Sequence, residues 1–288
     1  MENLYEISRE RKQYRQLECE GALLVEFRCL DNSSLIHDVW SHHAHIVYIT
    51  SGNKQWINTD GDITVNKGEA IFCKKGGYHV RSFYEEEFCA LLFFFPEEFI
   101  RDTVLEYQEH LKMFNSSLLD FQMLKMNIDD NLKTFFDSSM MNLLQLKDPS
   151  NLLLKLKFKE LILQILTSSA NPKLAAYFMS TLKEDKVNLR KVMQDNLMAN
   201  LTLEEYARLC SRSLSSFKRD FQEIFGMAPG RWLRENRLKM AKMRLLSTDE
   251  NINDIAFHTG FETTSHFIRC FRKQFGLPPL QFRQQNCA

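Results

Sequence analysis

Residues 215–226 read SSFKRDFQEIFG, and residues 265–276 read SHFIRCFRKQFG. In each stretch, phenylalanines recur every four residues and a glycine closes the pattern. Arg219 and Arg269 hold the same place in the two copies, 50 residues apart. Apolar residues at this spacing lie on one face of an α-helix. The chain therefore encodes one short amphipathic helix twice.

A second short helical segment precedes each copy. Ala207 and Ala256 are 49 residues apart, whereas the later matches are 50 apart, so the second copy has one extra residue in its turn. Two short helices joined by a tight turn form a helix-turn-helix motif. Capping residues predict the boundaries: Thr202 with Glu205, Ser213 and Gly226 in the first copy, and Asn251, Thr263 and Gly276 in the second.

The residues left outside the apolar stripes are polar or basic. A helix that enters the major groove of DNA meets base edges with its N-terminal residues, and Arg can pair bidentately with guanine. Flanking Lys and Arg suit phosphates. In a single copy, these polar and basic residues could simply form a solvent-exposed face. Two copies with matched spacing favour a DNA-binding function instead. The predicted buried stripes are Phe217, Phe221, Ile224 and Phe225, and Phe267, Phe271 and Phe275.

Charge divides the chain near residues 182–187. Residues 1–185 hold 20 Lys and Arg against 27 Asp and Glu, a net charge of −7, and residues 186–288 hold 17 against 10, a net charge of +7. This asymmetry predicts a basic module joined to an acidic domain. We expect an α+β chain of two domains, 1–183 and 184–288, the second all-helical.

The first domain begins with short strands separated by turn signals, which is typical of a sandwich or barrel. We expect this barrel over about 20–96 and helices over about 97–182. The expected strands are 25–30, 45–50, 54–59, 70–75, 78–84 and 90–95. A helix opened by Asp148-Pro149 continues as NLLLKLKFKELILQIL, which is apolar on more than one face and must be covered, either by the core or by a second copy of the chain.

Several classes of protein are disfavoured. The seven cysteines include no C-x-x-C pair, which argues against a zinc ribbon or disulfide framework and for a reducing cytoplasm. No apolar run approaches the ~20 residues needed to span a membrane, and the N-terminus lacks the apolar region of a secretory signal. We therefore expect a cytoplasmic protein without membrane contact.

The stretch 186–283 resembles the DNA-binding domain of the AraC/XylS family of bacterial transcription regulators. The second motif has that family's I-A-x-x-x-G-F, S-x-F-x-R-x-F and G-x-x-P-x-x-x-R patterns. The helix between the motifs, 232–246, is similar to its R-L-x-x-A-x-x-L-L pattern. Phe217, His266 and Pro278 depart from the usual residues, which affects the bases read rather than the fold.

The resemblance implies two recognition helices in adjacent major-groove segments of one DNA face. It implies regulation of transcription, more often activation, at a promoter operator with RNA polymerase as a partner. Arg219 and Arg269 have an alternative role in pairing with phosphate or neighbouring acids. By this resemblance the DNA contacts are Ser215, Lys218, Arg219, Thr264, Ser265, His266 and Arg269, with Arg272 flanking them.

In this family an N-terminal cupin-like barrel often binds a small effector, and the blocks at 42–56 and 67–79 resemble the cupin motifs. His43, His45 and His79 could supply three metal ligands, but no acid stands at 47–50. Three alternatives stay open: a metal-dependent cupin enzyme fused to a DNA-binding domain, a metal-free ligand pocket with these histidines and Trp56, or a filled barrel that contacts a regulatory protein. No nucleophile–base set, P-loop or Rossmann fingerprint supports an enzyme, so we expect neither enzyme activity nor a cofactor.

Overall fold

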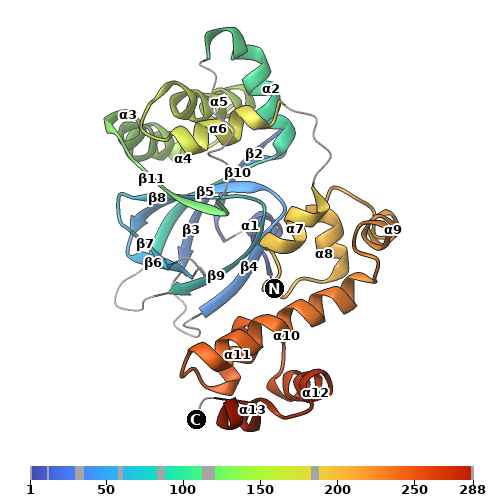
Figure 1. Ribbon diagram of the computed structural model, residues 1–288. Coiled ribbons are helices and arrows are strands. Elements are labelled where there is room, and N and C mark those ends of the chain that lie inside the picture. Colours follow the sequence, from blue (N-terminus) through green and yellow to red (C-terminus); the bar gives the residue numbers. More distant parts are fainter. Residues whose placement is uncertain are drawn as a thin grey trace. The chain divides into compact units, whose positions relative to one another are not determined.

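The computed structural model describes residues 2–11, 13–29, 36–57, 61–82, 88–111, 121–182 and 188–286. The chain forms two compact units, one within Glu2–Asp185 and the other within Lys186–Ala288. Figure 1 shows the sheets in the first unit and an all-helical second unit. The predicted fold class, α+β with a cupin-like β domain and a helical domain carrying two helix-turn-helix motifs, is confirmed. Within the described ranges, no helix is long and apolar enough to cross a membrane.

Two sheets form the centre of the first unit, and all their strand pairs are antiparallel except β1 with β4. The five-stranded sheet has the order β1 (Glu2–Asn3), β4 (Ile36–Ser41), β9 (Gly76–Ser82), β6 (Asn53–Ile57) and β7 (Ile63–Asn66). The six-stranded sheet has the order β11 (Met123–Met126), β8 (Ala70–Cys73), β5 (Ala44–Ser51), β10 (Phe88–Phe95), β3 (Ala22–Cys29) and β2 (Arg15–Cys19).

All six predicted strands are present, as β3, β5, β6, β8, β9 and β10. Residues 30, 58–59 and 83–84 of the predicted ranges lie outside the described residues. The sheets extend beyond the predicted barrel of about 20–96, because β2 precedes it and β11 follows it. Strand β10 pairs with β3 and β5 and is buried along both faces. Leu91, Phe93 and Phe95 pack on the helices, whereas Leu92 and Phe94 face the other sheet. Burial on both faces explains the unbroken apolar run.

Helices cover the outer face of the six-stranded sheet (Figure 1). The largest, α5 (Asn151–Thr167), begins after Ser150 rather than at the predicted Asp148-Pro149, because Ser150 has an extended backbone. Its buried residues, among them Phe158 and Ile162, join the core with the sheet. The other helical segments are α1 (Leu4–Glu10), α2 (Glu97–Tyr107), η1 (Gln108–His110), α3 (Asp130–Thr134), the π-helical η3 (Phe135–Met140), α4 (Met141–Gln145) and α6 (Pro172–Ser180).

The second unit contains helices and connecting turns and no strand within its described residues. Its helices are α7 (Leu189–Asp195), α8 (Leu203–Leu209), α9 (Leu214–Phe225), α10 (Pro229–Ser247), α11 (Ile252–His258), α12 (Thr264–Phe275) and α13 (Pro279–Asn286). The pairs α8–α9 and α11–α12 are the two helix-turn-helix motifs, and α9 and α12 lie on either side of the long helix α10 (Figure 1).

Candidate nucleic-acid interface

The two helix-turn-helix motifs start and stop on the residues that local signals predict. Thr202 and Glu205 form the reciprocal capping box of α8, and Asn251 caps α11. The hydroxyls of Ser213 and Thr263 accept the backbone N–H groups of Ser216 and His266 at the starts of α9 and α12. Left-handed Gly226 and Gly276 end these two helices. Each cap satisfies backbone groups that a helix end leaves unpaired.

The turn between the paired helices is one residue longer in the second motif, as predicted. Residues 210–213 join α8 to α9, and residues 259–263 join α11 to α12. Both turns use the same backbone hydrogen bonds, from Arg212 N to Ala207 O and from Phe261 N to Ala256 O. The extra residue therefore follows a shared turn and leaves the helix pairing intact.

An aromatic triad holds each recognition helix against the helix that follows it. In the first motif the rings of Phe221, Phe225 and Trp232 contact one another with centroid distances of 4.3 to 5.9 Å. The corresponding rings of the second motif are Phe271, Phe275 and Phe282, at 4.5 to 5.9 Å. Aromatic pairs at these distances add to the free energy of burial, so both helices rest on the same kind of core.

The predicted DNA-contact residues lie on exposed surface of α9 and α12. Position by position, the two helices are exposed alike except that Ser216 is half-buried and His266 is exposed. Thr264 is half-buried at the start of α12. Ile224 was predicted to be buried, but 41% of it is exposed because it lies at the edge of the apolar stripe. The exposed predicted residues are Ser215, Lys218, Arg219, Ser265, His266, Arg269 and Arg272.

The two repeated arginines differ in their surroundings. Arg219 Nη2 lies 3.4 Å from Asp220 Oδ1, and the other oxygen of that carboxylate pairs with Arg212 Nε at 2.9 Å. Within the described part of the chain, Arg269 forms no ion pair, and Cys270 stands where Asp220 does in the first motif. Among the described residues, no carboxylate therefore competes for the Arg269 guanidinium.

Sequence reasoning missed Ile268 on the same exposed surface. It takes the place of Lys218 and lies one turn after Ser265, and 37% of it is exposed. An exposed apolar side chain on a recognition helix can contact the methyl group of thymine. Comparison of the two copies could have found it, because an apolar residue in the second copy stands where the first copy has a basic one.

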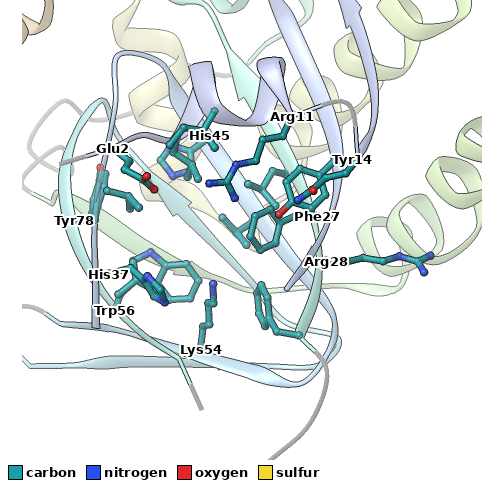
Figure 2. A pocket seen from close by; sticks show the side chains of 18 residues that line it. Glu2, Arg11, Tyr14, Phe27, Arg28, His37, His45, Lys54, Trp56 and Tyr78 are labelled. Atoms are coloured by element: carbon teal, nitrogen blue, oxygen red, sulfur yellow. The ribbon is translucent and has the colours of Figure 1, made fainter. Parts of the chain in front are cut away.

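A cavity of about 840 Å³ lies in the first unit, mainly between the two sheets. Its wall includes two of the four predicted ligand residues, His45 and Trp56. Most of the wall is apolar or aromatic, and Arg11 and Lys54 point into the space (Figure 2). Burial lowers the pKa of His45 to about 4, so its imidazole is neutral at neutral pH.

His43 and His79 lie outside the cavity wall. His79 stands between two wall residues of β9, Tyr78 and Val80, and alternation along a strand turns it to the other face. There its Nδ1 lies 2.6 Å from Asp38 Oδ1. The rings of His43 and Tyr5 pack edge to face at 4.7 Å. Burial, and to a smaller extent the charges of His42 and Lys75, lower the pKa of His43 to about 3.

The geometry gives no support to a metal-dependent barrel. Among the residues whose positions are described, no three His, Cys, Asp or Glu side chains are grouped so that they could hold a metal ion. A cupin metal site needs such a group of ligands. The three histidines that the sequence put forward therefore do not form such a group.

Comparisons with known proteins agree with both halves of the chain. Residues 44–177 match the family described as the ExsA N-terminal regulatory domain, and residues 206–285 match the family described as a helix-turn-helix domain. The virulence regulon transcriptional activator VirF of Yersinia enterocolitica is 28% identical over 273 residues, covering 92% of this chain and 98% of VirF. The thermoregulatory protein LcrF of Yersinia pestis is 28% identical over 262 residues, covering 88% and 94%.

Among solved structures, a ToxT variant from Vibrio cholerae covers 93% of this chain and 99% of its own, at 14% identity and a TM-score of 0.46. The two family matches and the relatives that span nearly the whole chain accord with the paired helix-turn-helix motifs described above. The chain belongs to the AraC/XylS family of bacterial transcription regulators.

Proposed function

We propose that the chain is a cytoplasmic transcription activator that binds one asymmetric promoter site through α9 and α12 and works with RNA polymerase there. The observation that carries this proposal is the pair of recognition helices with matched exposed faces but different side chains. Two different helices in one chain read two different half-sites, so the site need not be a palindrome. The full-length relative VirF is named as a transcriptional activator, which supports the direction of regulation.

Roles follow from the side chains. Arg269 is the strongest candidate for bidentate pairing with guanine, and Ser265 and His266 stand near it at the start of α12. Arg219 and Ser215 do the same for α9, and Thr264 orients the start of α12. Lys218 and Arg272 are placed to neutralise phosphates. We assign these contacts to the domain 184–288.

In vitro selection from random DNA with the full chain tests this proposal, followed by footprinting on the selected sequence. We expect one non-palindromic site covering two adjacent major-groove segments, with affinity that falls steeply as salt rises. Scrambling either segment should lower the affinity. Binding that ignores salt, or a site that tolerates scrambling of one segment, would contradict the two-helix mechanism.

A small effector in the first unit is a second proposal, and the cavity carries it. Most of its wall is apolar or aromatic, and two cations, Arg11 and Lys54, face inward with one acid, Glu2 (Figure 2). The ammonium group of Lys54 lies 4.2 Å from the centre of the Phe88 ring. We expect a largely apolar anion to bind there. The dye anilinonaphthalene sulfonate has this chemistry, and its fluorescence should rise with the wild type and fall with Val47→Phe, which fills the cavity, and with Lys54→Ala. Equal signals from all three would exclude the cavity as the binding site.

Dimerisation through the helices of 97–182 is the remaining part of the proposal. In the first unit, the large apolar residues that are exposed all lie on or near α5, within the described residues: Leu105, Leu146, Leu152, Leu153 and Leu156. An ion pair between Lys159 and Glu106 places the end of α2 beside α5. Exposed apolar side chains gathered on one helix are typical of an interface. Light scattering should report a dimer that becomes a monomer in Leu152→Glu/Leu156→Glu and persists in the control Thr167→Glu.

A further inference from the structure

One arginine in the middle of the second unit bonds to segments on both sides of it. Arg237 lies on α10, the helix between the two helix-turn-helix motifs. Its Nε donates to Leu197 O at 2.8 Å, and its Nη2 donates to Ala199 O at 2.6 Å. Its Nη1 donates to Gly260 O at 2.8 Å. A planar guanidinium can address three carbonyls at once because its donors form a fixed fork.

The carbonyls of Leu197 and Ala199 belong to a segment fastened to the first motif. Tyr206 of α8 is fully buried, and its hydroxyl donates to Asn196 O at 2.6 Å and to Ala199 O at 3.3 Å. Burial raises the pKa of Tyr206 to about 12, so the hydroxyl stays a donor at neutral pH. Through this segment, Arg237 holds α8 and therefore the first motif.

Gly260 belongs to the turn of the second motif, and its surroundings explain why no side chain stands there. A Cβ built on Gly260 would lie 2.7 Å from Met198 O and 2.9 Å from Arg237 Nε. Ser211 holds the equivalent place in the first turn, also with positive φ, and keeps its side chain. The left-handed backbone alone therefore does not require glycine. Contact with Arg237 and with the segment at 197–199 does.

We infer that Arg237, seated against Gly260, is a positioning residue that fixes the two helix-turn-helix motifs relative to each other and so sets the spacing of the DNA site. This inference rests on the proposed two-helix function. Helix α10 has 19 residues and a length of ~28 Å at 1.5 Å per residue. Recognition helices on one DNA face must match a repeat of about 34 Å, so a hinge in this unit would blur the spacing that the site can have.

The test compares the full chain with Arg237→Met, Arg237→Lys and the control Arg234→Met, which removes an exposed arginine from the same helix. Dissociation constants are measured on the selected site, on the same site with one or two base pairs inserted between its segments, and on sites with one segment scrambled. The affinity of the wild-type protein for the scrambled sites tests the proposed function by itself. The variants decide the role of Arg237.

Arg237→Met should weaken binding to the native spacing by about 10- to 100-fold, the range that loss of one well-placed contact gives. Its affinity for the scrambled sites should match the wild type within about threefold, since each motif keeps its own core. The preference for native over altered spacing should collapse, with Arg237→Lys intermediate and Arg234→Met unchanged. A uniform loss on every DNA, or an unchanged spacing preference, would overturn the inference.

A DNA-free measurement keeps the inference decidable if Arg237→Met folds poorly. Gly260→Ser introduces the residue that the first turn tolerates, and Ser211→Gly is its matched control. Spin labels carried by non-natural residues at Glu223 and Lys273, equivalent exposed positions of α9 and α12, report the distance between the motifs. We expect a distance distribution at least about twice as broad in Gly260→Ser, and an unchanged one in Ser211→Gly. Equal widths in both would contradict a positioning role.

Discussion

The two helix-turn-helix motifs have matching helices, caps and aromatic triads, but different contacts stabilise their turns. In the first, Arg212 of the turn pairs with Asp220 of α9 at 2.9 Å and also donates to Cys210 O. In the second, the corresponding turn buries Phe261, whose ring contacts Phe267 at a centroid distance of 5.1 Å. One turn is thus fastened by a partly exposed ion pair and the other by aromatic packing.

This difference shows which parts of the motif the fold needs. Caps and phenylalanines recur because every copy must close its helix ends and bury one stripe. The fastening of the turn varies because an ion pair and a buried ring both fix the angle between the helices. The way the turn is held also affects the DNA-contacting face of the helix. Asp220 partly neutralises Arg219, whereas Arg269 has no such neighbour among the described residues.

The largest effects should come from the shared core. Phe217 and Phe267 are fully buried at equivalent positions. Replacing either with Ala leaves a cavity, and each substitution should lower the free energy of unfolding of the second unit by about 3–5 kcal/mol. Urea unfolding followed by circular dichroism measures this. If one substitution cost several times more than the other, the two motifs would not share one kind of core.

DNA binding should distinguish the two arginines. Arg269→Ala should weaken binding to the selected site by about 1–3 kcal/mol and relax the preference at one base pair. Arg219→Ala should cost less, because its guanidinium is already shared with Asp220. Dissociation constants on the native site and on single-base variants test the order. A larger loss at Arg219, or a uniform loss across all sequences, would argue that both side chains hold phosphate.

Lys218 and Ile268 hold equivalent positions, and their substitutions should affect DNA binding in different ways rather than to different extents. Ile268→Ala should cost ~1 kcal/mol at one A·T pair through a lost methyl contact, without changing the dependence on salt. Lys218→Ala should weaken binding to all sequences and lower the salt slope by about one. Titrations at three salt concentrations separate the two. A salt slope that falls in Ile268→Ala would show that its effect comes from altered positioning of the phosphate contacts.

Much of the second unit could be predicted because its signals are local. Thr202, Ser213 and Thr263 cap helices that begin one residue later, and Gly226 and Gly276 end helices in the left-handed conformation, as their spacing indicated. Repetition added strength, because each copy tested the interpretation of the other. The apolar strand at 90–95 could also be predicted from the sequence. Because both of its faces are buried, it has no alternation of polar and apolar residues.

The rest depends on contacts between distant segments. Nothing near Arg237 in the sequence shows that its guanidinium meets the carbonyls of Leu197, Ala199 and Gly260. His79 resembled a ligand by motif, yet strand alternation turns it toward Asp38 and away from the cavity. Strand β2 escaped prediction because RQLEC is mostly polar and lies at a sheet edge, where one neighbour suffices.

The smallest effect should be an acid sensitivity confined to the first turn. A hydrogen bond from Arg212 holds the pKa of Asp220 below its usual value. A carboxyl with a lowered folded pKa stabilises the protein above its unfolded pKa of ~3.9, and this stabilisation is lost as pH falls through the folded value. The wild type should therefore unfold at a slightly higher temperature than Asp220→Asn at pH 6, and at the same temperature once the pH lies below the folded pKa. The control Glu262→Gln changes a carboxylate of the second turn, which is packed by Phe261, and its unfolding temperature should match that of the wild type at both pH values. If the difference between the wild type and Asp220→Asn persisted in acid, the carboxylate would act through its shape rather than its charge.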